Sequence, residues 1–290
     1  MSGVAGQVPA RKDPSKAAVT PELRAWWSWR RLADVTLPAA LILVALLPLW
    51  PVYLAGNAVV AGVGGVLLGA TVAAAGAWRR WNALTLIAVA LVVLVVFASL
   101  AAPTTALAGV LPTLETWQTV GVSVVRVWRQ VLTLLPPVGD AGGLLTVVYL
   151  LSFIGALTAV TVALRAKRTR SLALIAPAVV LVIALLLGTR TVVVPALTAG
   201  LFVLVGLGWT AWRSGRLQTT RPVATAALAV AGLVGVGTGL VFGPTPADRF
   251  VLRDHVDPPR LDQSYPSPLA GFRSYLKLHL DDTLFTLNGA

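Results

Sequence analysis

The chain has 290 residues, of which 57% are hydrophobic and 12% are charged, and its mean hydropathy is +0.83. Soluble domains carry about 25% charged residues, so this composition excludes a soluble protein and indicates a membrane protein. The formal net charge is +12, and the sequence has no cysteine, which excludes disulfide bonds, thiolate metal sites and a cysteine nucleophile within these residues.

Seven uncharged apolar stretches predict an all-α polytopic membrane protein. A helix needs about 17 to 25 apolar residues to cross the hydrocarbon, where every backbone polar group must be bonded internally. An N-terminal basic tail, 1–34, comes before a seven-helix bundle, 35–242, in which Trp50, Pro51 and Asn57 mark the expected break between the first two spans. The predicted spans are about 35–54, 58–78, 83–100, 144–164, 171–187, 191–212 and 222–242.

The distribution of basic residues predicts the orientation, because short loops rich in Lys and Arg stay in the cytoplasm. With seven spans, the N-terminus is expected in the cytoplasm and the C-terminus outside a plasma membrane. Because the basic residues lie mostly on one side, we interpret the positive net charge as a result of topology and of contact with anionic lipid of the bilayer, rather than of nucleic-acid binding. The residues expected to determine the topology are Arg30, Arg31, Arg79, Arg80, Arg165, Lys167, Arg168, Arg170, Arg213 and Arg216.

Residues 113–135 predict a further amphipathic helix, capped by Thr113 and ended by Pro136. Placing Arg126 and Arg129 at the bilayer centre would cost roughly 2.5 to 3.5 kcal/mol each, which argues against an eighth span. We expect an extracytoplasmic interfacial helix that packs against the bundle, with a membrane-surface or partner-contacting role as the alternative. Its apolar face is expected to contain Leu114, Trp117, Gly121, Val124, Val125, Trp128, Leu132 and Leu135.

The predicted spans contain no Asp, Glu, Lys, Arg or His. Ion-coupled transporters and proton pumps usually keep an ionisable group inside the membrane, so this absence disfavours both classes. Small residues four positions apart let helix backbones approach closely, and Gly65, Gly69, Gly235 and Gly239 are therefore predicted to lie in helix contacts. No catalytic, cofactor-binding or metal-binding residue is predicted.

Residues 243–290 predict an extracytoplasmic linker followed by the start of a mixed α/β region. The segment 283–287 has the composition of a strand and is followed by Asn288-Gly289, the strongest signal for a tight hairpin turn. A hairpin needs a second strand after that turn. We therefore expect the polypeptide to continue beyond Ala290.

Several loop segments resemble the membrane-anchored transglutaminase-like proteins of actinobacteria. The similar segments are GVLPTLETW, LTLLPP, DRFVLRDHVDPP, YPSPLAGFRSYLK and DDTLFTLNG. The resemblance implies that a helical bundle is followed by an extracytoplasmic transglutaminase-like core with a Cys-His-Asp triad. In such a core the thiolate attacks a carbonyl group, the histidine transfers the proton and the aspartate orients the imidazole.

No member of that triad can be assigned to a residue of this chain, because cysteine is absent and neither His255 nor His279 matches the motif. We therefore expect a membrane anchor and scaffold for a cell-envelope protein whose catalytic domain lies outside this sequence, with other envelope proteins as candidate partners. The alternative is a transporter or channel component for an apolar or lipid-like substrate.

Overall fold

The computed structural model describes residues 28–109, 111–134, 136–166, 170–189, 195–213 and 252–256. These residues are mostly helical, and they contain no strand beyond an isolated bridge between Leu107 and Leu111. The predicted all-helical class is therefore confirmed for this part of the chain. The predicted seventh span, 222–242, and the predicted α/β region at the C-terminus lie outside the described residues.

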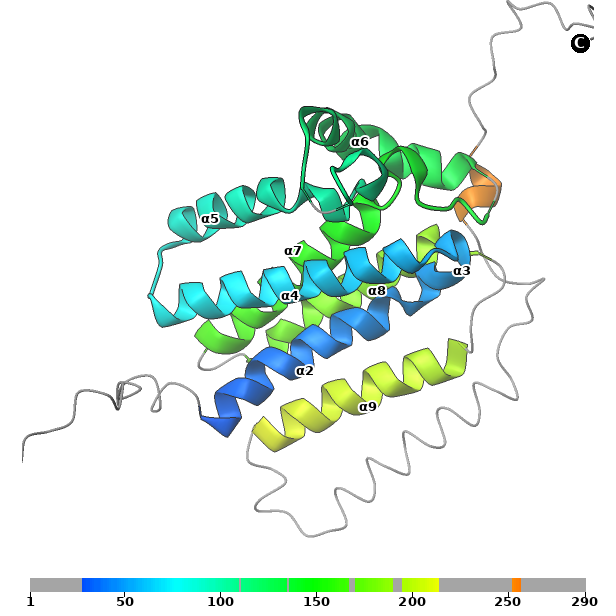
Figure 1. Cartoon of the computed structure of the whole chain (residues 1–290). Helices are drawn as coiled ribbons and strands as arrows, with labels where there is room; N and C mark the ends of the chain where they lie inside the picture. Colours follow the sequence, from blue (N-terminus) through cyan, green and yellow to red (C-terminus); the bar gives the residue numbers. More distant parts are fainter. Residues whose placement is uncertain are drawn as a thin grey trace, which may run out of the picture.

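The longer helices run back and forth between the two ends of a bundle (Figure 1). Short turns and 3₁₀ segments connect many of them. The α-helices are α2 (Trp29–Leu46), α3 (Trp50–Tyr53), α4 (Gly56–Trp78), α5 (Ala83–Val96), α6 (Leu114–Thr133), α7 (Thr146–Arg165), α8 (Ile175–Leu187) and α9 (Pro195–Arg213). The 3₁₀ segments are η1 (Leu47–Leu49), η2 (Ala98–Leu100), η3 (Pro103–Thr105), η4 (Ala141–Gly143), η5 (Arg170–Leu174) and η6 (Leu252–His255).

Three helical segments of the described chain are long and apolar enough to cross a membrane: Trp29–Tyr53, Gly56–Trp78 and Thr146–Arg165. Shorter apolar helices are found at the positions of the third, fifth and sixth predicted spans. Helix α5 has 14 residues, or about 21 Å at 1.5 Å per residue, and the hydrocarbon core is about 30 Å thick. Helix α5 ends at Val96, although the sequence predicts that the third span extends to residue 100.

The first predicted span begins earlier than expected, and it turns at Leu54, which is its predicted end. Helix α2 begins at Trp29, so Asp34 lies within the helix rather than at the end of a tail. The chain stays helical through η1 and α3, which contain Trp50 and Pro51, and it turns only at Leu54, whose φ of 44° is left-handed. These two predicted break markers therefore lie inside the helical segment.

Helix α7 occupies the centre of the bundle. It packs most extensively along α4, and it also contacts α2, α6 and α8. Its N-terminal half is enclosed on all sides, so that Tyr149 and Phe153 are almost fully buried. Helix α5 is far more exposed, since only Leu86 and Ala90 are buried in it. The core of the protein therefore lies along the contact between α4 and α7.

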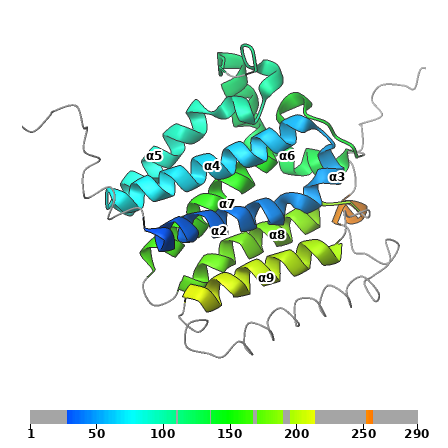
Figure 2. The same ribbon diagram turned by 60° about the horizontal axis from the view of Figure 1, so that its bottom comes forward.

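The bundle has two chemically different ends, which lie to the left and right in Figures 1 and 2. Helices α4, α7 and α9 finish at the end where α2 begins, and we name it the basic end. The other end, where α4 and α7 begin and α8 finishes, is the distal end. The described arginines at the basic end are Arg30, Arg31, Arg79, Arg80, Arg165, Arg170 and Arg213.

The predicted amphipathic helix is present as α6, which begins at Thr113 as expected. The Thr113 hydroxyl accepts from the Thr116 backbone N–H at 3.2 Å, and the Thr116 hydroxyl accepts from the Thr113 N–H at 3.1 Å. This capping box bonds backbone groups that a helix start would otherwise leave unpaired.

The face of α6 that packs against the bundle differs in part from the predicted one. Its buried residues are Thr116, Val120, Ser123, Val127 and Val131. From the predicted apolar face, Trp117 is 46% exposed and Val125 is 78% exposed. Small β-branched and hydroxyl side chains fit closely over α7 and η4, and Trp128 and Leu132 of the predicted face are partly buried against the same core, whereas Val124 and Val125 point away. The helix therefore has one apolar flank on the bundle and a second one facing outward.

Candidate functional site

A buried charge cluster at the basic end joins the first and last helices of the described bundle. Asp34 on α2 is 1% exposed, and its Oδ2 lies 2.6 Å from Nη2 of Arg213 on α9. Its Oδ1 accepts a hydrogen bond from the Trp209 indole N–H at 3.3 Å. Since both carboxylate oxygens have charged or polar partners, this carboxylate is tolerated inside the protein.

Sequence reasoning missed the role of Asp34, because the apolar run that marks the first span begins only at Val35. One signal was nevertheless present. Trp209 and Arg213 stand four residues apart and therefore share one face of a helix. Asp34 is a single acidic residue just before one apolar run, and the Trp-Arg pair stands at the end of another. An ion pair between two helix ends requires residues of these types.

The predicted topology-determining residues gather at the basic end wherever the structure describes them. Arg165 at the end of α7 donates to the carbonyls of Gly76 at 3.2 Å and Trp81 at 2.9 Å, which ties α7 to the turn between α4 and α5. Arg79 and Arg80 form that turn, and Arg30 and Arg31 begin α2. Lys167, Arg168 and Arg216 lie outside the described residues.

The distal end is held together by hydrogen bonds between its loops. The Tyr53 hydroxyl donates to the Leu144 carbonyl at 3.2 Å, and the Asn57 amide donates to Asp140 at 2.6 Å. The backbone N–H of Val138 donates to the Val52 carbonyl at 2.8 Å. The connection between α6 and α7 is thereby fixed to the hairpin between α2 and α4.

A short segment near the C-terminus, η6, also contacts the distal end. Nη2 of Arg253 donates to the Val131 carbonyl near the end of α6 at 2.8 Å, and η6 packs against α6 and α8. Figure 1 shows η6, in orange, beside the end of α6. The residues on the two sides of segment 214–251 therefore lie at opposite ends of the bundle: Arg213 at the basic end and Leu252 at the distal end.

Two of the predicted packing glycines lie directly against α7. A Cβ atom on Gly65 would overlap the Ser152 hydroxyl and stand 3.0 Å from the Tyr149 carbonyl. A Cβ atom on Gly69 would overlap the Phe153 carbonyl, which belongs to the backbone and cannot rotate away. Close approach of α4 and α7 thus requires glycine at position 69 and favours it at position 65. Gly235 and Gly239 lie outside the described residues.

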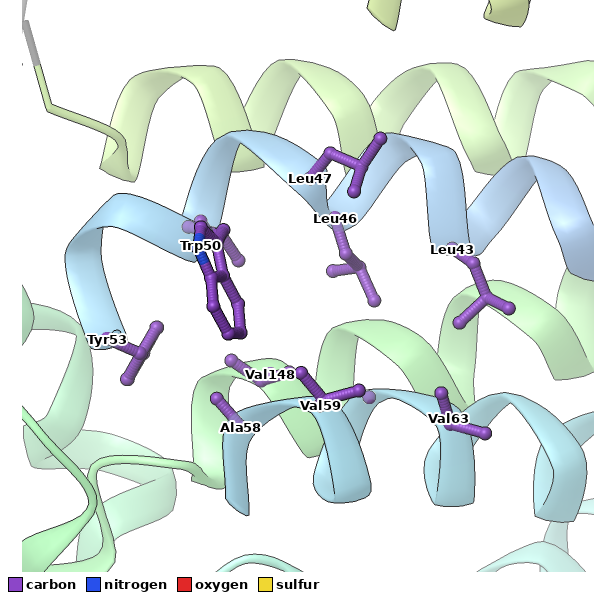
Figure 3. Close-up of a pocket in the computed structure, with 11 residues that line it drawn as sticks. Leu43, Leu46, Leu47, Trp50, Tyr53, Ala58, Val59, Val63 and Val148 are labelled. Atoms are coloured by element: carbon purple, nitrogen blue, oxygen red, sulfur yellow. The ribbon is translucent and has the colours of Figure 1, made fainter. Parts of the chain in front are cut away.

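The seam between α2 and α4 contains an apolar hollow of about 200 Å³ near the distal end. Figure 3 shows side chains from α2 and α3 facing those of α4 across it. A second hollow of about 190 Å³ lies on the same seam nearer the basic end. The first hollow is lined by Leu43, Leu46, Leu47, Leu49, Trp50, Tyr53, Ala58, Val59, Gly62, Val63 and Val148.

The described polar side chains make contacts between helices and loops at both ends of the bundle. Within the described ranges, no group of three or more His, Cys, Asp or Glu residues lies close enough together to hold a metal ion. The clusters at the two ends instead bind helices to each other and bind η6 to the bundle. No protein-family model matches the chain, and no curated protein or solved structure matches it.

Proposed function

We propose that this protein is the membrane anchor and scaffold of a transglutaminase-like cell-envelope protein. The bundle holds the polypeptide that follows Arg253 at one membrane face. The observation that carries this proposal is the hydrogen bond between Arg253 and the Val131 carbonyl, which attaches the segment after the predicted last span to the distal end. A scaffold needs such a contact, because a chain attached only by a free linker would leave the following domain without a fixed position.

The opposite positions of Arg213 and Arg253 support an odd number of membrane crossings. The described helices bring the chain to the basic end at Arg213, and it reappears at the distal end at Leu252. A seventh span at 222–242 makes that connection. The positive-inside rule assigns the basic end to the cytoplasm, since its short turns carry the arginines. The distal end is then extracytoplasmic.

The transglutaminase-like part of the proposal rests on the resemblance of the loop segments. Two of these segments lie at or beside this contact: LTLLPP begins at Leu132, directly after Val131 near the end of α6, and DRFVLRDHVDPP contains η6. Similar residues therefore occur on both partners of the contact between α6 and η6. A scaffold for a neighbouring domain requires an attachment site together with the segment attached to it.

Cysteine labelling in intact cells tests the topology. The chain has no cysteine, so a single introduced thiol gives an unambiguous signal. We expect Ser267→Cys to react with a membrane-impermeant maleimide and Ser214→Cys to react only after the cells are permeabilised. The cysteine-free chain is the matched control. Labelling of both positions, or the reverse pattern, would contradict the proposed orientation.

The enzymatic part has a separate test. We expect the reading frame that follows the Ala290 codon to encode a cysteine, a histidine and an aspartate in a transglutaminase-like core. A stop codon directly after Ala290 would contradict this part of the proposal, whereas the labelling result would still decide the topology.

A further inference from the structure

The outward side of α8 is apolar, and no other described helix covers it. The helix packs against α2 and α7 through its opposite side, where Val180 and Ala184 are buried in the core. On the outward side, a row of side chains is 38% to 55% exposed. The row consists of Leu172 in η5, followed by Ile175, Val179, Val182 and Leu186 on α8.

The residues of this outward row follow one another at alternating intervals of three and four positions. Such heptad spacing keeps a row of side chains on one side of a helix over several turns, and helices use it to pack along a nearly parallel neighbour. All residues of the row are large and aliphatic. A second helix approaches such a row closely when it carries small residues at the same spacing.

The chain on the two sides of segment 214–251 meets the two ends of α8. At the basic end, α9 contacts η5, which leads directly into α8, and Trp209 shares an apolar cluster with Ala173. At the distal end, where α8 finishes, η6 packs against α8. The most direct path from Arg213 to Leu252 therefore runs along α8, and the side of α8 left open by α2 and α7 is the outward one.

The predicted span 222–242 fits this path in length and direction. At 1.5 Å per residue it is about 30 Å long, which is the thickness of the hydrocarbon core. The connection 214–221 before it has the length that usually joins neighbouring helices, about 2 to 8 residues. Because the chain passes from the basic end to the distal end, the span runs in the same direction as α8.

Glycines occur in the predicted span at the spacing of the outward row. The midpoints of the predicted spans 171–187 and 222–242 are residues 179 and 232, so the two residues are expected at the same depth in the membrane. From these midpoints, intervals of three and four positions follow on both helices. The facing pairs are then Val179 with Gly232, Val182 with Gly235, and Leu186 with Gly239.

We infer that the outward side of α8 is the docking surface for the predicted span 222–242, which packs parallel to α8 with its glycines against the aliphatic row. Lipid tails are as apolar as leucine, so helices associate in a bilayer through close packing rather than through apolarity alone. The glycines allow this close packing. The inference rests on the seventh crossing in the proposed function, and it does not require a transglutaminase-like domain.

Disulfide crosslinking tests this packing, because the chain has no native cysteine to compete. Val182→Cys/Gly235→Cys is oxidised with copper–phenanthroline in native membranes, solubilised, and cleaved at a protease site inserted between Arg216 and Leu217. A disulfide forms only where the two Cβ atoms lie about 3.5 to 4.5 Å apart. We expect the two fragments to migrate as one band without reductant and as two bands after reduction.

Two matched pairs identify the sides that are in contact. Gly237 lies about 200° around the predicted helix from Gly235, so Val182→Cys/Gly237→Cys places the second thiol on the opposite side. Leu91 on α5 is as exposed and apolar as Val182, but α5 packs on α4. We expect separate fragments from Val182→Cys/Gly237→Cys and from Leu91→Cys/Gly235→Cys. Equal crosslinking at positions 235 and 237 would indicate random collision and would overturn the inference.

Leu186→Cys/Gly239→Cys is a second pair, one turn closer to the distal end, and we expect it to crosslink as well. Circular dichroism verifies that the variants keep their helix content. Folded variants in which neither pair crosslinks would overturn the inference. A band of twice the chain mass from Val182→Cys alone would also overturn it, because a second copy of the chain would then cover this side of α8. Labelling at positions 214 and 267 reports the topology separately, so a correct orientation without crosslinks would refute only the docking surface.

Discussion

Asp34 on α2 forms an ion pair of 2.6 Å with Arg213 on α9, and this buried contact joins the first and last helices of the described bundle. The side chains of both residues are largely buried, with exposures of 2% and 15%. Removing charges from water is costly, so a pair in this position contributes less to net stability than its short distance implies. Removing only one residue of the pair is far more damaging, because the charge of the other residue stays buried without this partner.

We therefore expect Arg213→Ala to destabilise the packing of α9 by about 3 to 5 kcal/mol. The double variant Asp34→Asn/Arg213→Gln is expected to lose much less, since it leaves no buried charge. Thermal unfolding in detergent measures both effects. Arg30→Ala, an exposed arginine at the same end, is the control and should stay within about 0.5 kcal/mol of the unmodified chain. Equal losses in the single and double variants would contradict this account of the pair.

Glycine at position 69 is required by the backbone of α7. We expect Gly69→Ala to destabilise the bundle by about 1 to 3 kcal/mol, because the added methyl group overlaps the Phe153 carbonyl and the helices must move apart. Gly121→Ala on α6 meets no atom within 4 Å, and it should stabilise its helix by up to about 1 kcal/mol. Unfolding midpoints of the two variants give the comparison, and similar midpoints would show that α4 and α7 are not closely packed in solution.

Gly65→Ala offers a graded version of the same test. Its methyl group meets the Ser152 hydroxyl, which is a side-chain atom that can rotate or be removed. We expect Gly65→Ala to be less damaging than Gly69→Ala, and we expect Ser152→Ala to recover part of the loss. Double-mutant cycles measure this recovery as a coupling energy. Additive effects of the two substitutions would indicate that residues 65 and 152 do not touch.

The sequence predicts the helices well because apolar length is a local property. The spans 58–78 and 144–164 match α4 and α7 to within about two residues at each end, which is the usual uncertainty of helix boundaries. The cap of α6 at Thr113 is equally local, since the hydroxyl bonds a backbone group three residues away.

Contacts between distant residues could not be predicted in the same way. The sequence does not reveal that Asp34 turns toward α9, nor which of two apolar flanks of α6 meets α7. That choice depends on side-chain size: Val120 and Val127 fit over the central helix, whereas Trp117 extends to the edge of the bundle and bonds the Val95 carbonyl at 3.1 Å. The order of apolar residues along the chain is the same for both arrangements.

We expect the apolar side of α6 that faces away from the bundle, which includes Val125, to contact lipid. Val125 is 78% exposed and neighbours Arg126, which points about 100° away around the helix. We expect a fluorophore at Val125→Cys to be quenched more strongly by a spin-labelled lipid, and one at Arg126→Cys more strongly by iodide in water. Measuring both quenchers at both positions supplies the internal control. Strong iodide quenching at position 125 would place this flank in water and contradict the prediction.

Arg253 is expected to determine how firmly the chain after η6 is held. Its guanidinium bonds the Val131 carbonyl, so Arg253→Ala removes the charge-assisted hydrogen bond that attaches η6 to α6. With spin labels at Gln118→Cys and Val256→Cys, electron–electron distance measurements should give a narrow distribution in the presence of Arg253 and a broad one in Arg253→Ala. Arg129→Ala is the matched control, because this arginine lies exposed on α6 and has no contact with η6 among the described hydrogen bonds. A broad distribution already present with Arg253 intact would show that the distal end does not hold this segment, and the scaffold function would lose its main support.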